Sequence, residues 1–179
     1  MVYVLLGTGF EEIEALTPVD LLRRAGVEVM TVGVNGKTVY GSHHIGVEAD
    51  IELGQIDLTN MDMIVLPGGL GGVASVRASK EAMDALRFAW DNEKYVAAIC
   101  AGPTVLADLG ITEGRHATCY PGQAGNMKGA VLEERAAVRD GKLITGASAG
   151  CAVEFALALV EALKGQDAAE TVRKQIVIR

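Results

Sequence analysis

The chain has 179 residues, a formal net charge of -7 and a sequence pI near 5.0. A chain of this length buries roughly 70% of its unfolded surface as one unit, so we expect a single domain over residues 1–179. The acidic balance and the lack of any run of Lys and Arg argue against direct binding to nucleic acid. Half of the residues are hydrophobic but only 4% are aromatic, a composition typical of parallel α/β sheets.

The apolar segments are short. Residues 1–6 lack a basic start and are too short for a signal peptide, and no uncharged apolar run approaches the roughly 18 residues of a membrane helix. Three cysteines without regular spacing argue against a disulfide scaffold. We therefore expect a cytoplasmic protein with reduced thiols and no membrane segment.

Apolar runs alternate with amphipathic segments in the N-terminal half. The helical segment draws its apolar stripe from Leu16, Val19, Leu21 and Leu22. An Asn35-Gly36 turn predicts an excursion of two short extended pieces. In order, we predict strand 2–6, helix 11–25, strand 27–34, extended pieces within 38–50, strand 63–66 and helix 80–93.

The C-terminal half continues this alternation. We predict strand 96–99, helix 102–109, short strand 117–119, two or three strands within 131–145, buried helix 151–163, polar helix 166–174 and a final strand 176–178. Strands alternating with helices imply right-handed crossovers and a mostly parallel sheet. In such sheets the ligand crevice lies beyond the carboxyl ends of the strands.

Cys100 lies where a buried strand stops and a helix starts. Its neighbours, Ala101, Gly102 and Pro103, are small or turn-forming, so the backbone can bend sharply and direct the thiol into the crevice. The helix macrodipole is expected to lower the pKa of the thiol from ~8.5 into the range of ~3.5 to 7.5. The alternative is a small buried hydrophobe, which is common for cysteine. We favour a reactive thiol.

The glycine-rich segment 66–71 ends a second strand at the same edge of the sheet. Its bare backbone amides, paired with the amide of Ala101, can form an oxyanion hole. Residues 69–74 also match the G-x-G-x-x-A dinucleotide pattern, but no ribose-binding acid follows on an adjacent strand. We therefore expect no cofactor.

Three carboxylates open the first helix. Two of them are expected to cap the helix and to be solvated, as is usual for an acidic first turn. Glu14 lies three residues after Glu11 and can instead face the crevice. Burial and a neighbouring thiolate would raise the pKa of this carboxyl, so that it stays protonated and donates a hydrogen bond.

Several of these motifs together resemble the ThiJ/PfpI family, and within it the parkinsonism-associated deglycase branch. They are Glu11-Glu12-Ile13-Glu14 with Pro18-Val19-Asp20, Leu66-Pro67-Gly68-Gly69, Ala97 to Pro103, and Glu154-Phe155-Ala156-Leu157-Ala158. The resemblance implies a flavodoxin-like three-layer sandwich, related to class I glutamine amidotransferases, and a homodimer. It also implies Cys100 as nucleophile, Glu14 as its protonated partner, and the Gly69 and Ala101 amides as oxyanion donors.

Departures from the family pattern bear on mechanism. Tyr120 stands where that branch carries a histidine, so only a hydroxyl is offered as a supporting donor. Ala101 follows the cysteine where the peptidase branch has histidine, which disfavours a Cys-His protease. A glutamine amidotransferase is disfavoured because no histidine follows His116. Residues 147–150 replace an Arg-Gly-Pro-Gly loop, and His43 replaces an arginine, so anion contacts from those positions are in doubt.

Three further sequence features could suggest a functional site, but we expect each of them to be structural. Residues 146–150 fit the G-x-S-x-G pattern of serine hydrolases, but no histidine follows, so we expect Ser148 to cap a helix. Cys151 is expected to pack among Ala and Val. His43 and His44, with Glu48 and Asp50, are expected to form a solvated edge, since adjacent strand residues face opposite sides. We therefore expect no metal site.

The resemblance implies glutathione-independent glyoxalase or deglycase activity on a small aldehyde, in the manner of a glyoxalase III-like lyase. The alternative is a redox-responsive stress protein or chaperone that senses oxidation at Cys100. A serine or cysteine hydrolase is the least favoured of the three.

Overall fold

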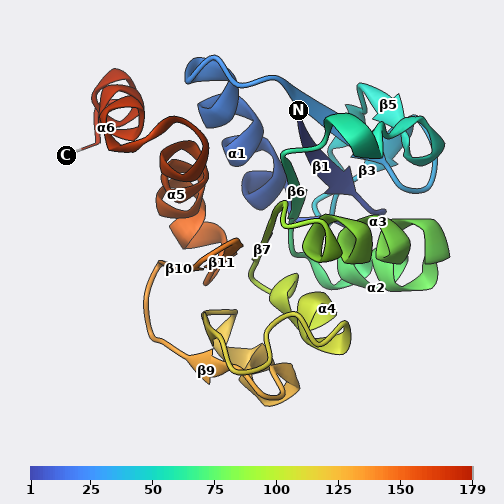
Figure 1. Ribbon diagram of the computed structural model, residues 1–179. Helices are drawn as coiled ribbons and strands as arrows, with labels where there is room; N and C mark the ends of the chain where they lie inside the picture. The colour runs from blue at the N-terminus through green and yellow to red at the C-terminus, as the bar shows by residue number, and fades with distance from the viewer. Residues whose placement is uncertain (179) are drawn as a thin grey trace.

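Apolar runs form the central strands of a seven-stranded sheet in the computed structural model, which describes residues 1–178 (Figure 1). The strand order is β10-β11-β7-β6-β1-β2-β5. Every pair is parallel except β10 with β11. The strands are β1 (Val2–Leu6), β2 (Val29–Gly33), β5 (Ile51–Glu52), β6 (Met63–Leu66), β7 (Tyr95–Ile99), β10 (Ala137–Asp140) and β11 (Leu143–Gly146). The predicted α/β fold with a mostly parallel sheet is confirmed.

Helices cover both faces of the sheet. They are α1 (Glu12–Arg24), α2 (Leu70–Ala78), α3 (Lys80–Asp91), α4 (Pro103–Asp108), α5 (Ala152–Lys164) and α6 (Gln166–Gln175). One layer holds α1, α5 and α6, and the other holds α2, α3 and α4 (Figure 1). Because both faces are covered, β1 and β6 are buried at every position, which explains their uninterrupted apolar sequences.

Short elements connect the strands and helices of the main sheet. The excursion predicted for 38–50 is an antiparallel pair, β3 (Thr38–Tyr40) with β4 (Gly46–Glu48). A second small pair joins β8 (His116–Ala117) to β9 (Val131–Leu132). The remaining elements of residues 1–178 are the 3-10 turns η1 (Leu53–Gln55), η2 (Leu58–Asn60), η3 (Pro121–Asn126) and η4 (Ala149–Cys151).

Helix α2 was not predicted, because its sequence begins Leu-Gly-Gly and glycine disfavours helices. The glycines serve close packing instead. A Cβ on Gly72 would lie 2.7 Å from the Cα of Phe10, so the start of α2 rests directly on the loop after β1. This contact brings the segment after β6 against the start of α1.

The final strand predicted at 176–178 is wrong. These residues close α6: the Ile176 amide donates to Val172 O at 3.0 Å, and Val177 has a φ of 56°. A chain that turns back on its helix in this way cannot pair with a sheet edge. Apolar composition alone does not distinguish such a closing turn from a short strand.

The apolar stripe predicted for α1 is partly wrong. Val19, Leu21 and Leu22 are buried, but Leu16 is 37% exposed. The inward positions of the first turn belong to Glu12 and Glu14, whose side chains are buried. The helix therefore hides carboxylates where an ordinary amphipathic helix would hide leucines.

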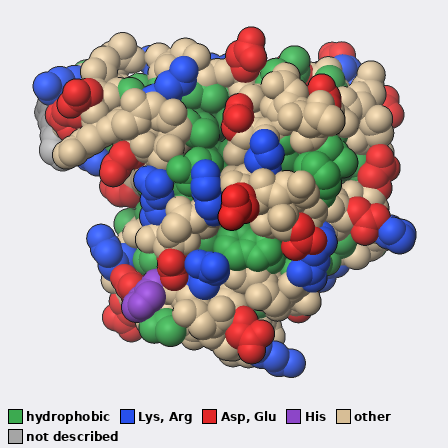
Figure 2. Space-filling view, viewed as in Figure 1, with side chains coloured by type: hydrophobic (Ala, Val, Ile, Leu, Met, Phe, Trp, Pro, Cys, Tyr) green, Lys and Arg blue, Asp and Glu red, His purple; other side chains and the backbone are tan. Residues whose placement is uncertain are grey.

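Basic and acidic side chains are intermixed over the face drawn in Figure 2, with no region given over to one sign. Within residues 1–178, no helix has the length and apolar character needed to cross a bilayer.

Candidate active site

Cys100 forms the elbow between β7 and α4. Its φ is 65°, a left-handed conformation that costs a non-glycine residue roughly 1–3 kcal/mol and therefore needs support from its surroundings. Two backbone hydrogen bonds give that support: the Cys100 amide donates to Gly146 O and its carbonyl accepts from the Tyr120 amide, both at 2.9 Å. Small neighbours are required here, since a Cβ on Gly102 would lie 2.7 Å from Leu66 O. The predicted strand-to-helix elbow is present, and the thiol is half-buried.

Glu14 and Cys100 both lie next to Gly68, which is two residues beyond the end of β6. The Glu14 side chain is fully buried, and its Oε2 accepts a hydrogen bond from the Gly68 amide at 2.9 Å. A Cβ on Gly68 would strike Glu14 Oε2 and would lie 2.8 Å from Cys100 Cβ. The missing side chain at Gly68 is therefore what allows the carboxyl and the cysteine to lie against each other.

Glu11 caps the first turn of α1, the turn that carries Glu14. Its Oε2 accepts a hydrogen bond from the Glu14 amide at 2.8 Å, which caps α1 and orients the turn that carries Glu14. The capping role expected for one of the first-turn carboxylates is thus observed at Glu11.

The amides of Gly69 and Ala101 both point at the Cys100 sulfur and favour its thiolate. Gly69 has a φ of 83°, and a Cβ there would collide with Gly9 O and lie 2.7 Å from the Glu11 amide nitrogen. Only glycine fits this position. The oxyanion-hole role of these two amides stays a prediction.

Glu14 and Cys100 titrate as a pair. Burial raises the pKa of the Glu14 carboxyl to about 7. Burial and the adjacent Glu14 carboxylate raise the pKa of the Cys100 thiol to about 12. Because the groups interact, these values describe the pair: from pH about 7 to about 12 it carries one proton and one negative charge.

The pKa lowering expected for Cys100 from the helix macrodipole is therefore wrong. Helix α4 has only six residues, and its dipole is outweighed by burial and by the neighbouring carboxylate. The thiolate arises instead when the shared proton rests on Glu14. Glu14 Oε1 accepts no hydrogen bond from the described residues, so this oxygen is free to carry the shared proton.

Tyr120 lies beside the cysteine through its backbone. Its amide binds the Cys100 carbonyl, while its side chain is 49% exposed and lies against Gly122. The predicted supporting role of its hydroxyl stays a prediction.

Glu12, the neighbour of Glu11, contradicts the expectation of a solvated carboxylate. It is only 6% exposed and accepts hydrogen bonds from the His43 amide at 2.8 Å, the His43 Nδ1 at 2.9 Å and the Ser42 hydroxyl at 3.2 Å. Although burial opposes ionisation, the hydrogen bonds from His43 lower the pKa of Glu12 to about 2. This carboxylate fastens the β3–β4 hairpin to the start of α1.

The solvated edge predicted for His43, His44, Glu48 and Asp50 is confirmed, because all four residues are exposed. Asp50 binds Arg23 and Thr31, and His43 faces Glu11 and Glu12. Ligand atoms of Glu11, Glu12 and His43 lie within 4.8 Å of one another, so these three residues could meet around a metal ion. The hydrogen bonds between Glu12 and His43 already hold the hairpin.

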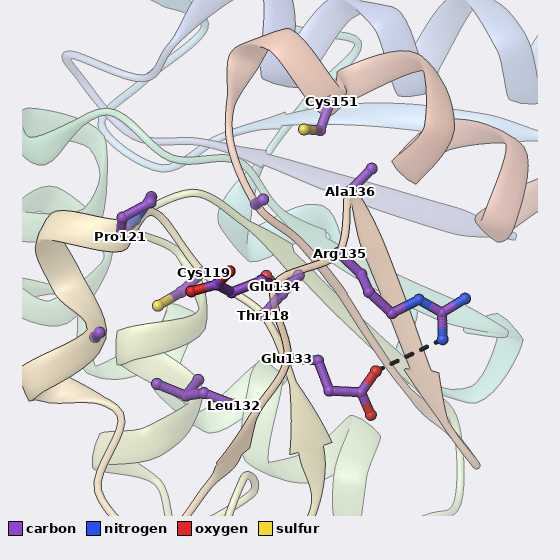
Figure 3. Close-up of a pocket in the computed structure, with 11 residues that line it drawn as sticks. Thr118, Cys119, Pro121, Leu132, Glu133, Glu134, Arg135, Ala136 and Cys151 are labelled. Carbon is purple, nitrogen blue, oxygen red and sulfur yellow. Dashed lines mark ion pairs between the residues drawn. The ribbon is translucent and has the colours of Figure 1, made fainter.

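A pocket of about 670 Å³ lies next to the segments that brace the elbow, and no sequence motif indicates it (Figure 3). Cys119 and Cys151 line it from different segments, and Ala136 and Ala147 form part of its wall. Ser148 does not cap the following helix as predicted: its hydroxyl lies 3.7 Å from Cys151 Sγ. A set of small side chains drawn from distant segments creates this space.

Comparisons with known proteins identify similar chains and similar folds. A profile described as the DJ-1/PfpI family matches residues 1–162. The protein dj-1beta of Drosophila melanogaster is 37% identical over 178 residues, which is 98% of this chain and 95% of that one. Its crystal structure has a TM-score of 0.93, covering 99% of this chain and 97% of the other. An oxidized Toxoplasma gondii DJ-1 structure is 32% identical with a TM-score of 0.93, covering 98% and 97% of the two chains. A Pyrococcus horikoshii protein named deglycase is 33% identical over 132 residues, 74% of this chain and 79% of its own.

Proposed function

Because the chain belongs to the DJ-1/PfpI family, we propose that it is a cysteine-dependent, glutathione-independent glyoxalase or deglycase. Its substrates are 2-oxoaldehydes or the early adducts that they form. The observation that carries the proposal is the contact of Cys100 with the buried Glu14, together with the Gly69 and Ala101 amides, which favour the Cys100 thiolate. A relative named deglycase supports it.

The first step uses the proton shared by the pair. With that proton on Glu14, the Cys100 thiolate attacks the aldehyde carbon and forms a carbon–sulfur bond. The amides of Gly69 and Ala101 bind the developing oxyanion, which then takes the proton from Glu14 to give a hemithioacetal. Glu14 is left as a carboxylate.

The second step moves hydrogen between the two carbonyl carbons. The Glu14 carboxylate removes the proton from the former aldehyde carbon and returns it to the neighbouring carbon, while the hydroxyl proton of the hemithioacetal passes to the oxygen of that neighbouring carbon. The first carbon is oxidised to a thioester and the second is reduced to an alcohol, so no external oxidant or reductant is needed. Water then attacks the thioester, Cys100 leaves as the thiol, and a 2-hydroxy acid is released.

The test is turnover of methylglyoxal to lactate without glutathione. We expect Cys100→Ala to lose at least ~10³-fold in kcat, because the nucleophile is gone. Cys119→Ala and Cys151→Ala are the matched controls and keep activity. Equal losses in all three variants, or no turnover by the wild type, would sink the proposal.

A second candidate is redox sensing by a stress-responsive protein or chaperone. The half-buried Cys100 sulfur faces two amides that would also bind the oxygens of a sulfinate. The solved structure of an oxidized Toxoplasma relative favours this candidate. Mild peroxide followed by peptide mass analysis tests it: two added oxygens on Cys100 support it, and oxidation confined to Cys119 or Cys151 removes it.

The same family membership supports a homodimer. Exposed apolar side chains on α1 and on the β3–β4 hairpin offer an interface, namely Ile13, Leu16, Tyr40 and Ile45. Sedimentation equilibrium at micromolar protein would show a mass of one chain if this expectation is wrong.

A further inference from the structure

The pocket of about 670 Å³ rests on the two segments that hold the nucleophile in place. Cys119 and Pro121 flank Tyr120, whose amide binds the Cys100 carbonyl. Ala147 follows Gly146, whose carbonyl accepts the Cys100 amide. The pocket wall therefore begins one residue away from each backbone partner of the reactive cysteine.

The wall is small and largely apolar on the side of these two segments. Ala124, Ala136 and Ala147 contribute only methyl groups, and Leu132 adds an isobutyl group (Figure 3). The Ala147 amide donates to Ala136 O at 3.0 Å, and the Thr118 amide donates to the Thr145 hydroxyl at 2.8 Å. The two segments are thus tied to each other, and the pocket is a built feature of the fold.

The charged groups of the pocket wall are Glu133, Glu134 and Arg135; Glu134 is exposed, and of the two carboxylates only Glu133 forms ion pairs within the described residues. Glu133 lies 3.6 Å from Arg135 (Figure 3) and 2.6 Å from His116. A strongly charged ligand would have to compete with these pairs, whereas an alkyl chain on the alanine side would not. The pocket volume of about 670 Å³ is within the usual range for ligand sites. The methyl group of methylglyoxal would occupy little of it and leave the rest to water.

We propose that this pocket binds the hydrocarbon substituent of the substrate, so that the chain prefers 2-oxoaldehydes with an unbranched alkyl group of several carbons over methylglyoxal. This inference rests on the proposed function and names its substrate class. The dicarbonyl end reacts at Cys100, and the alkyl end lies beside Ala136 and Ala147. Each buried methylene is worth roughly a fourfold gain in binding.

The experiment compares kcat/KM for methylglyoxal and 2-oxohexanal in the wild type, in Ala147→Leu and in Ala168→Leu. Ala168 is a half-buried alanine on α6 that lies outside the pocket lining, so it is a matched control. The wild type is expected to favour 2-oxohexanal by ~10-fold or more. Ala147→Leu fills the pocket and should cut that preference by ~10-fold. Ala168→Leu should keep the wild-type preference.

Leu132→Glu provides a second variant in case Ala147→Leu fails to fold. Leu132 is half-exposed, so a charge there disturbs the pocket rather than the core. It should reduce the preference for 2-oxohexanal in the same way. Equal kcat/KM for both aldehydes in the wild type, or an equal fall for both in the pocket variants, would overturn the proposal.

An NMR titration separates failure of the pocket from failure of the reaction. Cys100→Ala protein, which cannot turn over, is titrated with 2-hydroxyhexanoate and with lactate. We expect 2-hydroxyhexanoate to shift the resonances of Ala136, Ala147 and Leu132, and lactate to leave them in place. If the wild type turns over no aldehyde but these shifts occur, the proposed function fails and the pocket stands. Shifts confined to other parts of the chain would remove the pocket assignment.

Discussion

Glu12 and Glu14 lie two residues apart in the first turn of α1, and both are buried, yet their pKa values move in opposite directions. Glu12 faces the β3–β4 hairpin, where Ser42 and His43 give it three hydrogen bonds. Glu14 is buried near Gly68, whose amide donates to one of its oxygens, while the other oxygen accepts no hydrogen bond from the described residues. Burial alone therefore does not decide the charge of a carboxyl; the number of donors around it does.

The opposite pKa shifts give the two carboxyls different roles: one stabilises the fold and the other can transfer a proton. Glu12 is ionised at any ordinary pH and holds two segments together. Glu14 changes its protonation near neutrality, which is the property that a proton carrier needs. The same residue type, placed on two sides of one helical turn, supplies both roles.

The largest expected effect is on turnover. Glu14→Gln removes the proton carrier and should lower kcat for methylglyoxal by ~10²- to 10⁴-fold. Glu12→Gln leaves the shared proton in place and should cost less than ~10-fold. Lactate formation without glutathione measures both. Similar losses in the two variants would show that the carboxyls do not differ in role.

Stability should change in opposite directions and over different pH ranges. The Glu14 pKa is raised from 4.5 to about 7, so its ionisation opposes folding above pH 7, and the penalty disappears below 4.5. Glu14→Gln should therefore raise the free energy of unfolding by about 3 kcal/mol at pH 8 and by nothing at pH 4.

The pKa of Glu12 is lowered from 4.5 to about 2, so its stabilisation is complete above pH 4.5 and is lost as the pH falls through 2. Glu12→Gln should lower the free energy of unfolding by about 1–2 kcal/mol at pH 7, since the site lies near solvent. Urea unfolding followed by circular dichroism measures both variants, with the exposed Glu48→Gln as control. A stabilised Glu12→Gln protein at pH 7 would contradict this account.

The smallest expected effect concerns the space beside Glu12. A Cβ on Gly41 would strike the Glu12 carboxylate and lie 2.8 Å from its Cγ, so Gly41→Ala should cost about 1–2 kcal/mol of stability. Gly125→Ala is the matched control, because a Cβ there meets nothing within 4 Å. Thermal unfolding compares the two, and equal melting temperatures would mean that the hairpin moves aside freely.

The strands and the Cys100 elbow could be predicted because local sequence determines them. Uninterrupted apolar runs fit a sheet covered on both faces, and Ala101-Gly102-Pro103 permits a sharp turn. The separate environments of Glu12 and Glu14 could not be predicted in the same way. They depend on Ser42, His43 and Gly68, which are distant in sequence and reach the first turn only through the tertiary fold.

The prediction of a lowered pKa for Cys100 is wrong for the same reason. A helix N-terminus is visible in the sequence, but the extent of burial and the contact with a carboxylate are not. The pocket was missed because its alanines come from segments whose spacing carries no motif. The closing turn of α6 was missed because Ile-Val-Ile satisfies strand propensity without a sheet edge to join.

The two backbone bonds that brace the Cys100 elbow come from Tyr120 and Gly146, both later in the chain. During synthesis from the N-terminus, β1, β6 and β7 emerge before either partner exists. The unfinished polypeptide therefore carries this cysteine without its brace until β11 has left the ribosome. In a nascent chain, the rate at which an alkylating reagent modifies the Cys100 sulfur should therefore report when the sheet is complete.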